Sequence, residues 1–241
     1  MLKNKTAFIT GGSGALGSAI VRIFARENCR VAFSYKSHPE KAQQLEAELG
    51  EQVRAYPLDV LDANACTQTA AKIEQDLGPI DILINNASST QILPFAMIEE
   101  KDWDQAMDVN VKGTFLVTKA FARAMIRRKS GSIVNIGSLA GMRMLEVPVH
   151  YATAKSAILG FTLSLARELG RYNIRVNAVA PGMLTGGVSV NVPPKQREQY
   201  IQYCASSRMG TPAEVAELVA FLASDRAAYL NAQTILIDGG I

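Results

Sequence analysis

Three polar side chains in the second half of the sequence have the types and spacing needed to move a proton to or from a carbonyl oxygen. Tyr151 and Lys155 are four residues apart in a stretch of helical periodicity, so they share one helical face. Ser138 lies upstream and brings a hydroxyl that can hydrogen-bond the same oxygen. A phenol beside an ammonium is the proton-transfer half of a hydride-transfer reaction. Because such a pair also arises by chance, its weight depends on the rest of the chain.

Short apolar runs alternate with amphipathic segments along the whole sequence, which predicts a parallel sheet covered by helices. The predicted strands are Thr6–Thr10, Arg30–Tyr35, Val53–Leu58, Ile80–Ile84, Ser132–Ile136, Ile174–Val179 and Thr234–Ile237. The predicted helices are Ala15–Glu27, Pro39–Leu49, Ala63–Leu77, Glu99–Arg128, Tyr151–Tyr172 and Pro212–Ala223. With 241 residues and 48% hydrophobic content, we expect one α/β domain over residues 1–241, Rossmann-like and doubly wound, with a seven-stranded parallel sheet and helices on both faces.

Two segments depart from this alternation. The stretch Glu99–Arg128 is long for one helix, and we expect either two helices or a bend near Val111 to Gly113. The region Met183–Arg208 contains Val192-Pro193-Pro194 and lacks clean periodicity. It is interpreted as an excursion, a lid at about 183–208 that covers a site.

A glycine-rich loop follows the first predicted strand and opens the first predicted helix. Small residues at this point let the backbone approach a pyrophosphate at a helix N-terminus. The alternative is a tight strand-to-helix turn without a ligand, which the strand, glycine and helix context disfavours. The candidate phosphate-binding residues are Gly11, Ser13, Gly14, Ala15, Leu16 and Gly17.

The ends of the next predicted strands offer contacts for an adenosine. In such folds an acid at the tip of the second strand favours NAD, whereas a base accommodates the extra phosphate of NADP. Tyr35, Lys36 and Ser37 stand there without a carboxylate, so we predict NADP(H) over NAD(H); the alternative is that Lys36 is a solvated loop lysine. Further candidates, which are also ordinary turn residues, are Asp59, Val60, Asn86 and Ala87.

Composition excludes several other classes of protein. A net charge of +3 with 20% charged residues does not indicate a nucleic-acid binder. Cys29, Cys66 and Cys204 are widely separated, and only two histidines are present, so neither a disulfide framework nor a metal site is expected. The sequence has no signal-peptide pattern and no stretch long enough to span a bilayer, and we expect a cytoplasmic protein.

Six motifs in order resemble the short-chain dehydrogenase/reductase family over essentially the whole chain. TGGSGALG matches the family's glycine motif, NNAS approximates NNAG, and Asn110 lies at the family's helical asparagine. Ser138 precedes YATAK by the usual interval, and VNAVAPG matches the segment after the sixth strand. Within the family the chain is most similar to the 3-oxoacyl-acyl-carrier-protein reductases. The resemblance implies an NAD(P)-dependent oxidoreductase, usually a homotetramer.

The resemblance also implies a role for each polar residue. Tyr151 would protonate a ketone oxygen while hydride leaves the nicotinamide, and Ser138 would hold that oxygen. Lys155 would hold the nicotinamide ribose, and its charge about 4 Å away would lower the Tyr151 pKa by up to roughly three units. Asn110 would hold a water that connects Lys155 to solvent; the alternative is a buried asparagine satisfied by backbone. The turn Pro181, Gly182, Met183 and Leu184 would contact the nicotinamide.

Three positions depart from those reductases. Gly14 stands where many NADP-dependent members carry a basic residue, Ser88 replaces the last glycine of NNAG, and Thr185 is one place early in the turn after Gly182.

Apolar residues between Ser138 and Tyr151 suggest the kind of substrate. Together with Val188 they predict an apolar cleft suited to an acyl chain, the alternative being ordinary loop packing. The candidate substrate-binding residues, besides Ser138, are Met142, Met144, Leu145 and Val147. Basic residues at helix ends, Arg128, Lys129 and Arg171, are candidates for docking an acyl carrier protein, or they complement helix dipoles without any partner.

The favoured hypothesis is NADPH-dependent reduction of a 3-oxoacyl thioester in fatty-acid or polyketide-type biosynthesis. The alternative is a dehydrogenase or reductase of a free small alcohol, sugar or cyclic ketone. A nucleotide-sensing or scaffold protein would have the fold without the catalytic residues, and none of those residues is missing.

Overall fold

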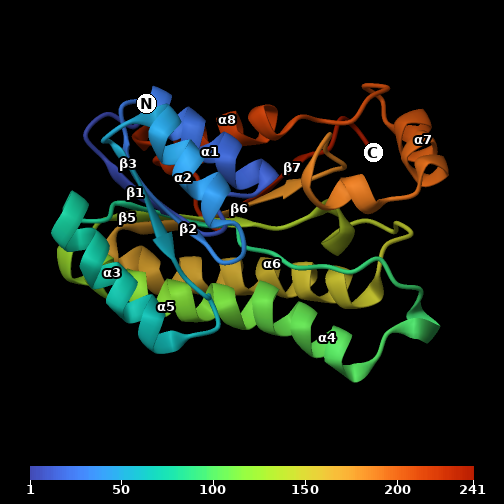
Figure 1. Ribbon diagram of the computed structural model, residues 1–241, viewed down its shortest axis with the longest axis horizontal. Coiled ribbons are helices and arrows are strands. Elements are labelled where there is room, and N and C mark those ends of the chain that lie inside the picture. Colours follow the sequence, from blue (N-terminus) through green and yellow to red (C-terminus); the bar gives the residue numbers. More distant parts are fainter.

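The structure, a computed structural model, describes residues 1–241 and contains one seven-stranded sheet (Figure 1). All strand pairs are parallel, and the order is β3-β2-β1-β4-β5-β6-β7. The strand order reverses direction between β1 and β4, the place where open α/β sheets bind ligands beyond the carboxyl ends. The strands are β1 Thr6–Ile9, β2 Arg30–Tyr35, β3 Val53–Pro57, β4 Ile82–Asn85, β5 Gly131–Ile136, β6 Ile174–Pro181 and β7 Thr234–Ile237. The predicted fold class is confirmed.

Two helical layers enclose the sheet (Figure 1). One layer consists of α1 Ala15–Arg26, α2 Pro39–Leu49 and α8 Pro212–Ala223. The other consists of α3 Ala63–Leu77, α4 Glu100–Met107, α5 Gly113–Arg128 and α6 Val149–Leu169. None of these helices combines the length and the apolar character that a membrane span requires.

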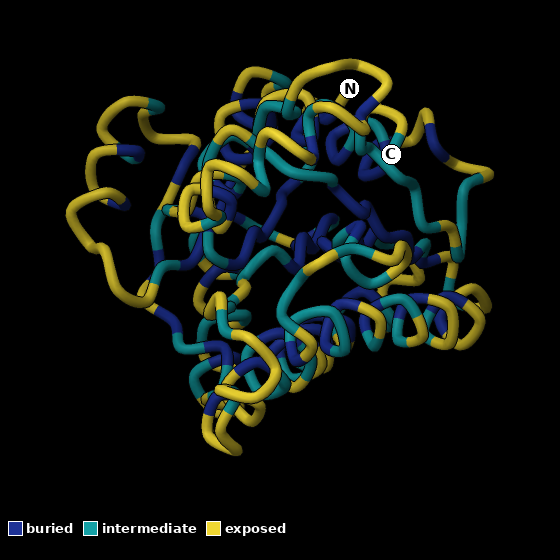
Figure 2. The backbone as a smooth tube through the Cα atoms, turned by 90° about the vertical axis from the view of Figure 1, so that its right-hand side faces the viewer, coloured by how far each residue is buried: buried dark blue, intermediate teal, exposed yellow.

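Alternating strand residues fill two separate cores, one on each face of the sheet. Ala7 and Ile9 of β1 pack with α1 and α8, whereas Phe8 points into the core beneath α3 and α5. There the Phe8 ring stacks on Phe121 of α5, with centroids 4.4 Å apart. Figure 2 shows the result, a buried centre with exposure on the outer faces of the helices. Burial on both faces explains why the strands are apolar throughout.

The long stretch predicted around Glu99–Arg128 is two helices, joined by the π-helical turn Asp108–Lys112. α5 begins at Gly113, where a Cβ would lie 2.7 Å from the Val60 side chain. Glycine therefore lets the start of α5 approach the loop after β3. The break lies where the sequence predicted it.

The segment 183–208 contains a helix that the sequence analysis missed. α7 spans Pro194–Tyr203, and a short 3₁₀ turn, Gly187–Asn191, precedes it. Pro194 occupies the first turn of α7, where its missing N–H has no intrahelical partner to lose. The buried Tyr200 holds α7 in place, because its hydroxyl donates to the Asp238 carbonyl and accepts from the Met183 N–H, each at 3.0 Å.

Candidate active site

A single cavity of about 970 Å³ runs along the carboxyl edge of the sheet. The loops after β1 to β4 and after β6 form one half of its wall, which we call the dinucleotide half. The loop after β5, the start of α6 and α7 form much of the other, which we call the substrate half. Every residue that the sequence assigned to the cofactor lines this cavity: Gly11, Ser13, Gly14, Ala15, Leu16, Gly17, Tyr35, Lys36, Ser37, Asp59, Val60, Asn86, Ala87, Tyr151, Lys155, Pro181, Gly182, Met183 and Leu184.

The glycine-rich loop brings the backbone of α1 to the cavity surface. Gly11 adopts φ +64°, a left-handed conformation that favours glycine, and a Cβ on Gly17 would overlap the Gly11 carbonyl. α1 begins after Gly14 without any side-chain cap. Its first N–H groups have no intrahelical partner and carry the positive end of the helix dipole. This end of the cavity fits the pyrophosphate of a dinucleotide.

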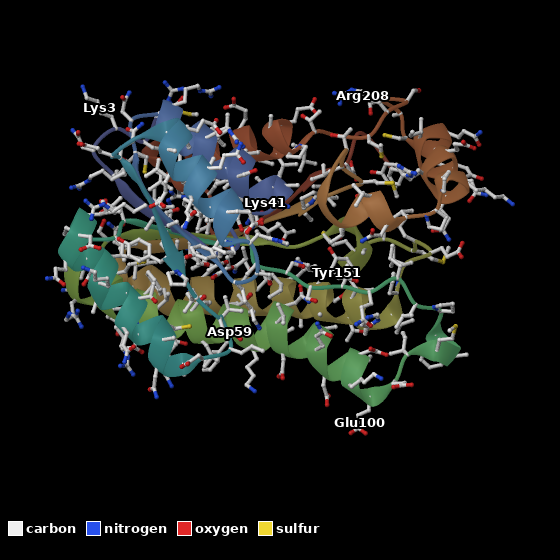
Figure 3. All side chains as sticks on the ribbon, viewed as in Figure 1. Lys3, Lys41, Asp59, Glu100, Tyr151 and Arg208 are labelled. Carbon is white, nitrogen blue, oxygen red and sulfur yellow. The ribbon has the colours of Figure 1, made fainter.

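An ion pair joins the ends of β2 and β3, at the end of the cavity where the sequence predicts the adenosine, which we call the adenosine end. Lys36 Nζ lies 2.6 Å from Asp59 Oδ2, and the Leu61 N–H donates to Asp59 Oδ1 at 3.0 Å. Burial alone would raise the Asp59 pKa, but the bonds from Lys36 and Leu61 hold that pKa below its ordinary value. Lys36 and Asp59 both line the cavity, and Asp59 lies toward the α3 and α5 side of the molecule (Figure 3).

The three residues with proton-transfer chemistry meet where the two halves of the cavity join. Tyr151 and Lys155 lie in the first and second turns of α6, and Ser138 follows the end of β5. Lys155 is buried and donates from Nζ to the Ile136 carbonyl at 3.0 Å. The Tyr151 ring centroid is 5.7 Å from this Nζ. Figure 3 shows Tyr151 near the middle of the molecule.

The loop after Ser138 is fastened directly to α6. The Ala140 N–H donates to Ser138 Oγ at 3.2 Å, which leaves the hydroxyl proton free for another acceptor. Gly141 packs so closely that a Cβ would lie 2.9 Å from the Lys155 carbonyl carbon. The Ser156 hydroxyl donates to the Gly141 carbonyl at 2.9 Å. Ser138 is therefore held at a fixed position relative to α6.

Burial controls the acidity of both ionisable groups. It lowers the pKa of Lys155 to about 8. It raises the pKa of Tyr151, while a hydrogen-bonding contact with the Ser138 side chain works in the opposite direction. The sequence led us to expect a lowered Tyr151 pKa, and this expectation was wrong for the protein alone. The physical reason is that burial removes the phenolate from water, and this desolvation destabilises the phenolate more than the hydrogen bond with Ser138 stabilises it.

Known proteins resemble this chain over its whole length. A family model described as enoyl-(acyl carrier protein) reductase matches residues 12–241. The 3-oxoacyl-[acyl-carrier-protein] reductase of Thermotoga maritima is 38% identical, covering 100% of this chain and 98% of that protein. The chain belongs to the short-chain dehydrogenase/reductase family. As a short-chain dehydrogenase/reductase, it is an NAD(P)-dependent oxidoreductase that acts on a CH–OH/C=O pair.

Other short-chain dehydrogenase/reductase relatives show the same extent of similarity. The acetoacetyl-CoA reductase of Shinella zoogloeoides is 36% identical and covers 98% of each protein. Nodulation protein G of Rhizobium meliloti is 37% identical, covering 100% of this chain and 98% of that protein. A solved short-chain dehydrogenase/reductase double mutant from Serratia marcescens superposes with a TM-score of 0.92 at 34% identity, covering 99% of this chain and 98% of that one.

Asn110, the family's helical asparagine, lies beside the cavity rather than in its wall. It is buried in the π-helical turn, and its side-chain amide donates to the carbonyls of Ser89 and Ala106 at 2.7 and 2.8 Å. Ser88, the residue that departs from the family motif, donates its hydroxyl to Asn110 Oδ1 at 2.6 Å. The amide group of the Asn110 side chain thus has hydrogen-bond partners within the protein. The Thr114 hydroxyl donates to the backbone carbonyl of Asn110 at 2.8 Å.

One of the sequence-based assignments needs correction. Met142 was assigned to the substrate, but it lies outside the cavity wall, whereas Met144, Leu145 and Val147 line it. Met142 directly follows the 3₁₀ turn Leu139–Gly141 and is exposed. Thr185 is exposed and does not line the cavity, while the buried Ser189 does and accepts from the Leu184 N–H at 3.3 Å.

The basic residues proposed for carrier docking lie at the opposite edge of the sheet. Arg128 and Lys129 immediately precede β5, and Arg171 precedes β6, so they stand at amino ends of strands. Arg128 is also engaged, since it pairs with Glu74 at 3.1 Å and donates to the Ile80 carbonyl. Because its guanidinium is already paired, Arg128 is no longer a candidate for docking a carrier protein. Lys129 and Arg171 remain exposed at that edge.

The substrate half contains polar residues that the sequence analysis missed. They come from the loop after β4, from α4, from the loop before α6 and from α7: Ser89, Thr90, Gln105, Glu146, Gln196, Gln199, Tyr200 and Tyr203. The four from α7 are spaced as residues on one face of a helix. This spacing could have indicated α7, but the segment was interpreted as an irregular lid.

Proposed function

We propose that this enzyme reduces a 3-oxoacyl thioester to the 3-hydroxyacyl thioester with NADPH. The observation that carries the proposal is the position of Tyr151, Lys155 and Ser138. They lie at the junction between a half cavity that fits a dinucleotide and a half cavity with an apolar wall. A ketone in the substrate half would meet a proton donor and a hydride donor together.

Each of the three residues has a distinct task in this proposal. Tyr151 donates its phenolic proton to the carbonyl oxygen, and the raised pKa keeps that proton in place until reduction begins. Ser138 donates its free O–H to the same oxygen and stabilises the charge that develops there. Lys155, held by the Ile136 carbonyl, has further protons for the ribose of the cofactor. When bound, the nicotinamide supplies the hydride.

The apolar wall of the substrate half supports an acyl substrate. Ile92, Met144, Leu145, Val147 and Val192 line it, and flexible methionines adapt to chains of different shape. The relatives from Thermotoga maritima and Shinella zoogloeoides are, by name, reductases of 3-oxoacyl-carrier and acetoacetyl-CoA thioesters. We further propose that 183–208, with α7, acts as a lid over this half.

The preference for NADPH rests on Lys36 and Ser37 at the adenosine end. Lys36 is the cation in the wall beside the loop after β2, where a 2′-phosphate would lie. Its ion pair with Asp59 means that the phosphate has to compete with a carboxylate. The preference is therefore expected to be moderate.

A second candidate function is reduction of a free, small, polar ketone. Thr90, Gln105, Gln196 and Gln199 in the wall favour it, because amides and hydroxyls can hydrogen-bond a hydroxylated substrate. A sugar or a cyclic ketone would use these groups, whereas an acyl chain would use the apolar wall.

Spectrophotometry with matched substrates separates the candidates. NADPH and NADH oxidation is followed with acetoacetyl-N-acetylcysteamine thioester, cyclohexanone, dihydroxyacetone and crotonyl-N-acetylcysteamine thioester. We expect the highest kcat/KM for the acetoacetyl thioester with NADPH. Higher values for the free ketones would favour the second candidate, and turnover of the crotonyl thioester alone would indicate an enoyl reductase.

Carrier delivery and assembly are linked in this proposal. A carrier docked at Lys129 and Arg171 stands at the amino edge, so it would serve the cavity of a neighbouring copy rather than this one. Exposed apolar side chains on α4, α5 and α6 provide a surface for such a homotetramer: Trp103, Phe115, Val149 and Leu163. We place the reaction in the cytoplasm, in keeping with the three unpaired cysteines.

A further inference from the structure

The ionisable side chains of the cavity are distributed unequally between its two halves. Lys36, His38 and Asp59 lie at the adenosine end, and Lys155 lies at the junction. Among the residues that line the substrate half, Glu146 is the only one with an acidic or basic side chain other than tyrosine. The substrate half therefore offers no cation to a negatively charged group.

Glu146 is exposed and lies at the cavity wall between two other lining residues. Leu145 and Val147, on either side of it, both line the cavity. Gln196 of α7 donates from Nε2 to Glu146 Oε1 at 3.3 Å, which connects the loop before α6 to α7. No ion pair neutralises this carboxylate, and the preceding cation in the sequence, Arg143, is exposed and does not line the cavity.

We propose that Glu146 determines substrate charge: it favours 3-oxo esters and thioesters and disfavours free 3-oxo acids. This inference rests on the proposed function, because it assumes that a ketone is reduced in the substrate half. It adds a specificity-determining residue that the motifs of the sequence did not indicate.

The physical basis is repulsion between like charges in a partly enclosed space. A free 3-oxo acid carries its carboxylate two carbons from the reacting carbonyl, so both groups must enter the substrate half. An ester or thioester masks that charge and avoids the repulsion. For charges several ångströms apart in this partly solvated wall, the discrimination expected is between about threefold and about thirtyfold. Rejection of one substrate by an unfavourable contact is a common source of specificity.

The experiment compares a neutral and an anionic form of one substrate. The kcat/KM of wild-type enzyme is measured with ethyl acetoacetate, acetoacetyl-N-acetylcysteamine thioester and acetoacetate, with NADPH saturating. The same measurements are made on Glu146→Gln and Glu146→Lys. Glu198→Gln is the matched control, since Glu198 is an exposed carboxylate of α7 that does not line the cavity. Circular dichroism verifies that each variant is folded.

The proposal predicts a change in one ratio. The ratio of kcat/KM for ethyl acetoacetate to that for acetoacetate should fall about tenfold in Glu146→Gln and further in Glu146→Lys, with no fall in Glu198→Gln. Added salt should raise acetoacetate turnover in wild type and not in Glu146→Gln, because it screens the repulsion.

Other outcomes are distinguishable. An unchanged ratio in Glu146→Gln and Glu146→Lys, with the thioester still reduced by wild type, overturns the role of Glu146 and leaves the proposed function intact. An equal fall in Glu198→Gln overturns it as well, because the effect would then belong to overall charge. Failure of wild type to reduce any of the three ketones instead contradicts the proposed function.

Discussion

Lys36 and Asp59 form an ion pair across the ends of β2 and β3, with Nζ 2.6 Å from Oδ2. Lys36, the cation proposed to bind the extra phosphate of NADP, is thus already paired with Asp59 in the cofactor-free protein. Under the proposed preference for NADPH, the phosphate of the cofactor would replace the Asp59 carboxylate at Lys36. The sequence pointed to both residues but not to the ion pair between them.

Replacing Asp59 with Asn should strengthen the preference for NADPH. The amide keeps an acceptor for the Leu61 N–H but removes the charge that holds Lys36. We expect KM for NADPH to fall about twofold to fivefold, in the range of a partly exposed ion pair, with a smaller change for NADH. Steady-state kinetics with both cofactors measures this, and Lys36→Ala should shift the ratio the other way. Parallel changes for both cofactors would dismiss Lys36 as the phosphate contact.

Tyr151→Phe should separate cofactor binding from chemistry. The ring and its packing remain, whereas the proton donor is lost. We expect kcat to fall by about 10² to 10⁴, the usual contribution of a general acid. The dissociation constant for NADPH, measured by fluorescence titration, should change less than threefold. Substantial remaining kcat would refute the role of Tyr151 as the acid.

The raised pKa of Tyr151 predicts a different pH dependence for each direction of the reaction. Reduction needs the protonated phenol, which is present at all pH values below its pKa, so kcat/KM for the ketone should stay level through neutral pH. Oxidation of the alcohol needs the phenolate and should rise about tenfold per pH unit over the same range. Rate profiles in both directions test this. A group titrating near neutrality in the free enzyme would contradict the prediction.

Lys155 should make the stability of the cofactor-free enzyme depend on alkaline pH. Its pKa falls from 10.5 to about 8 on folding. Below pH 8 the lysine is charged in both states, and its burial opposes folding. Between about pH 8 and 10.5 the folded protein has released a proton that the unfolded chain still binds, so stability rises with pH, by up to about 3 kcal/mol.

The measurement is the free energy of unfolding by denaturant, compared between wild type and Lys155→Met from pH 7 to 10.5. The difference should grow in favour of wild type as pH rises, because methionine cannot titrate. A pH-independent difference would show that Lys155 keeps its proton when folded.

Ser88→Ala should lower the free energy of unfolding, because it removes the hydrogen bond from Ser88 to Asn110. The change leaves the buried Asn110 Oδ1 without its donor. We expect a loss of about 1 to 3 kcal/mol in unfolding free energy. Ser89→Ala is the control, because the Ser89 hydroxyl accepts only a long 3.4 Å bond from Gln105. Equal losses in both variants would mean that the loop, not this bond, carries the effect.

The sequence predicted correctly those helices and strands whose residue pattern alone determines where they begin and end. The helix Ala63–Leu77 and the strand Arg30–Tyr35 have the predicted bounds, because periodicity and burial agree there. Tyr151 and Lys155 were found because their spacing along one helix already places them on one face. The break before Gly113 was visible because the stretch was too long.

Contacts between distant segments escaped prediction. Nothing in the sequence near Lys36 indicates Asp59, and nothing near Glu146 indicates Gln196, because both pairs exist only after the chain has folded. Met142 and Met144 looked equivalent in the sequence, yet only Met144 lines the cavity. α7 was missed because Pro193 and Pro194 suggested a loop and because the helix has few apolar residues to show helical periodicity.

Gly141 and Ser156 tie the Ser138 loop to α6, whereas α7 meets that part of the molecule through separate contacts such as Gln196 with Glu146. The substrate half is therefore built from two pieces of chain, the segment between Ser138 and Tyr151 and the separate helix α7. Exposed residues of α7 that make no contact with Ser138 or Tyr151 can be changed while Tyr200, which anchors the helix, is kept. This division of labour gives evolution, or a protein engineer, a segment in which selectivity can be rewritten while the reaction itself is retained.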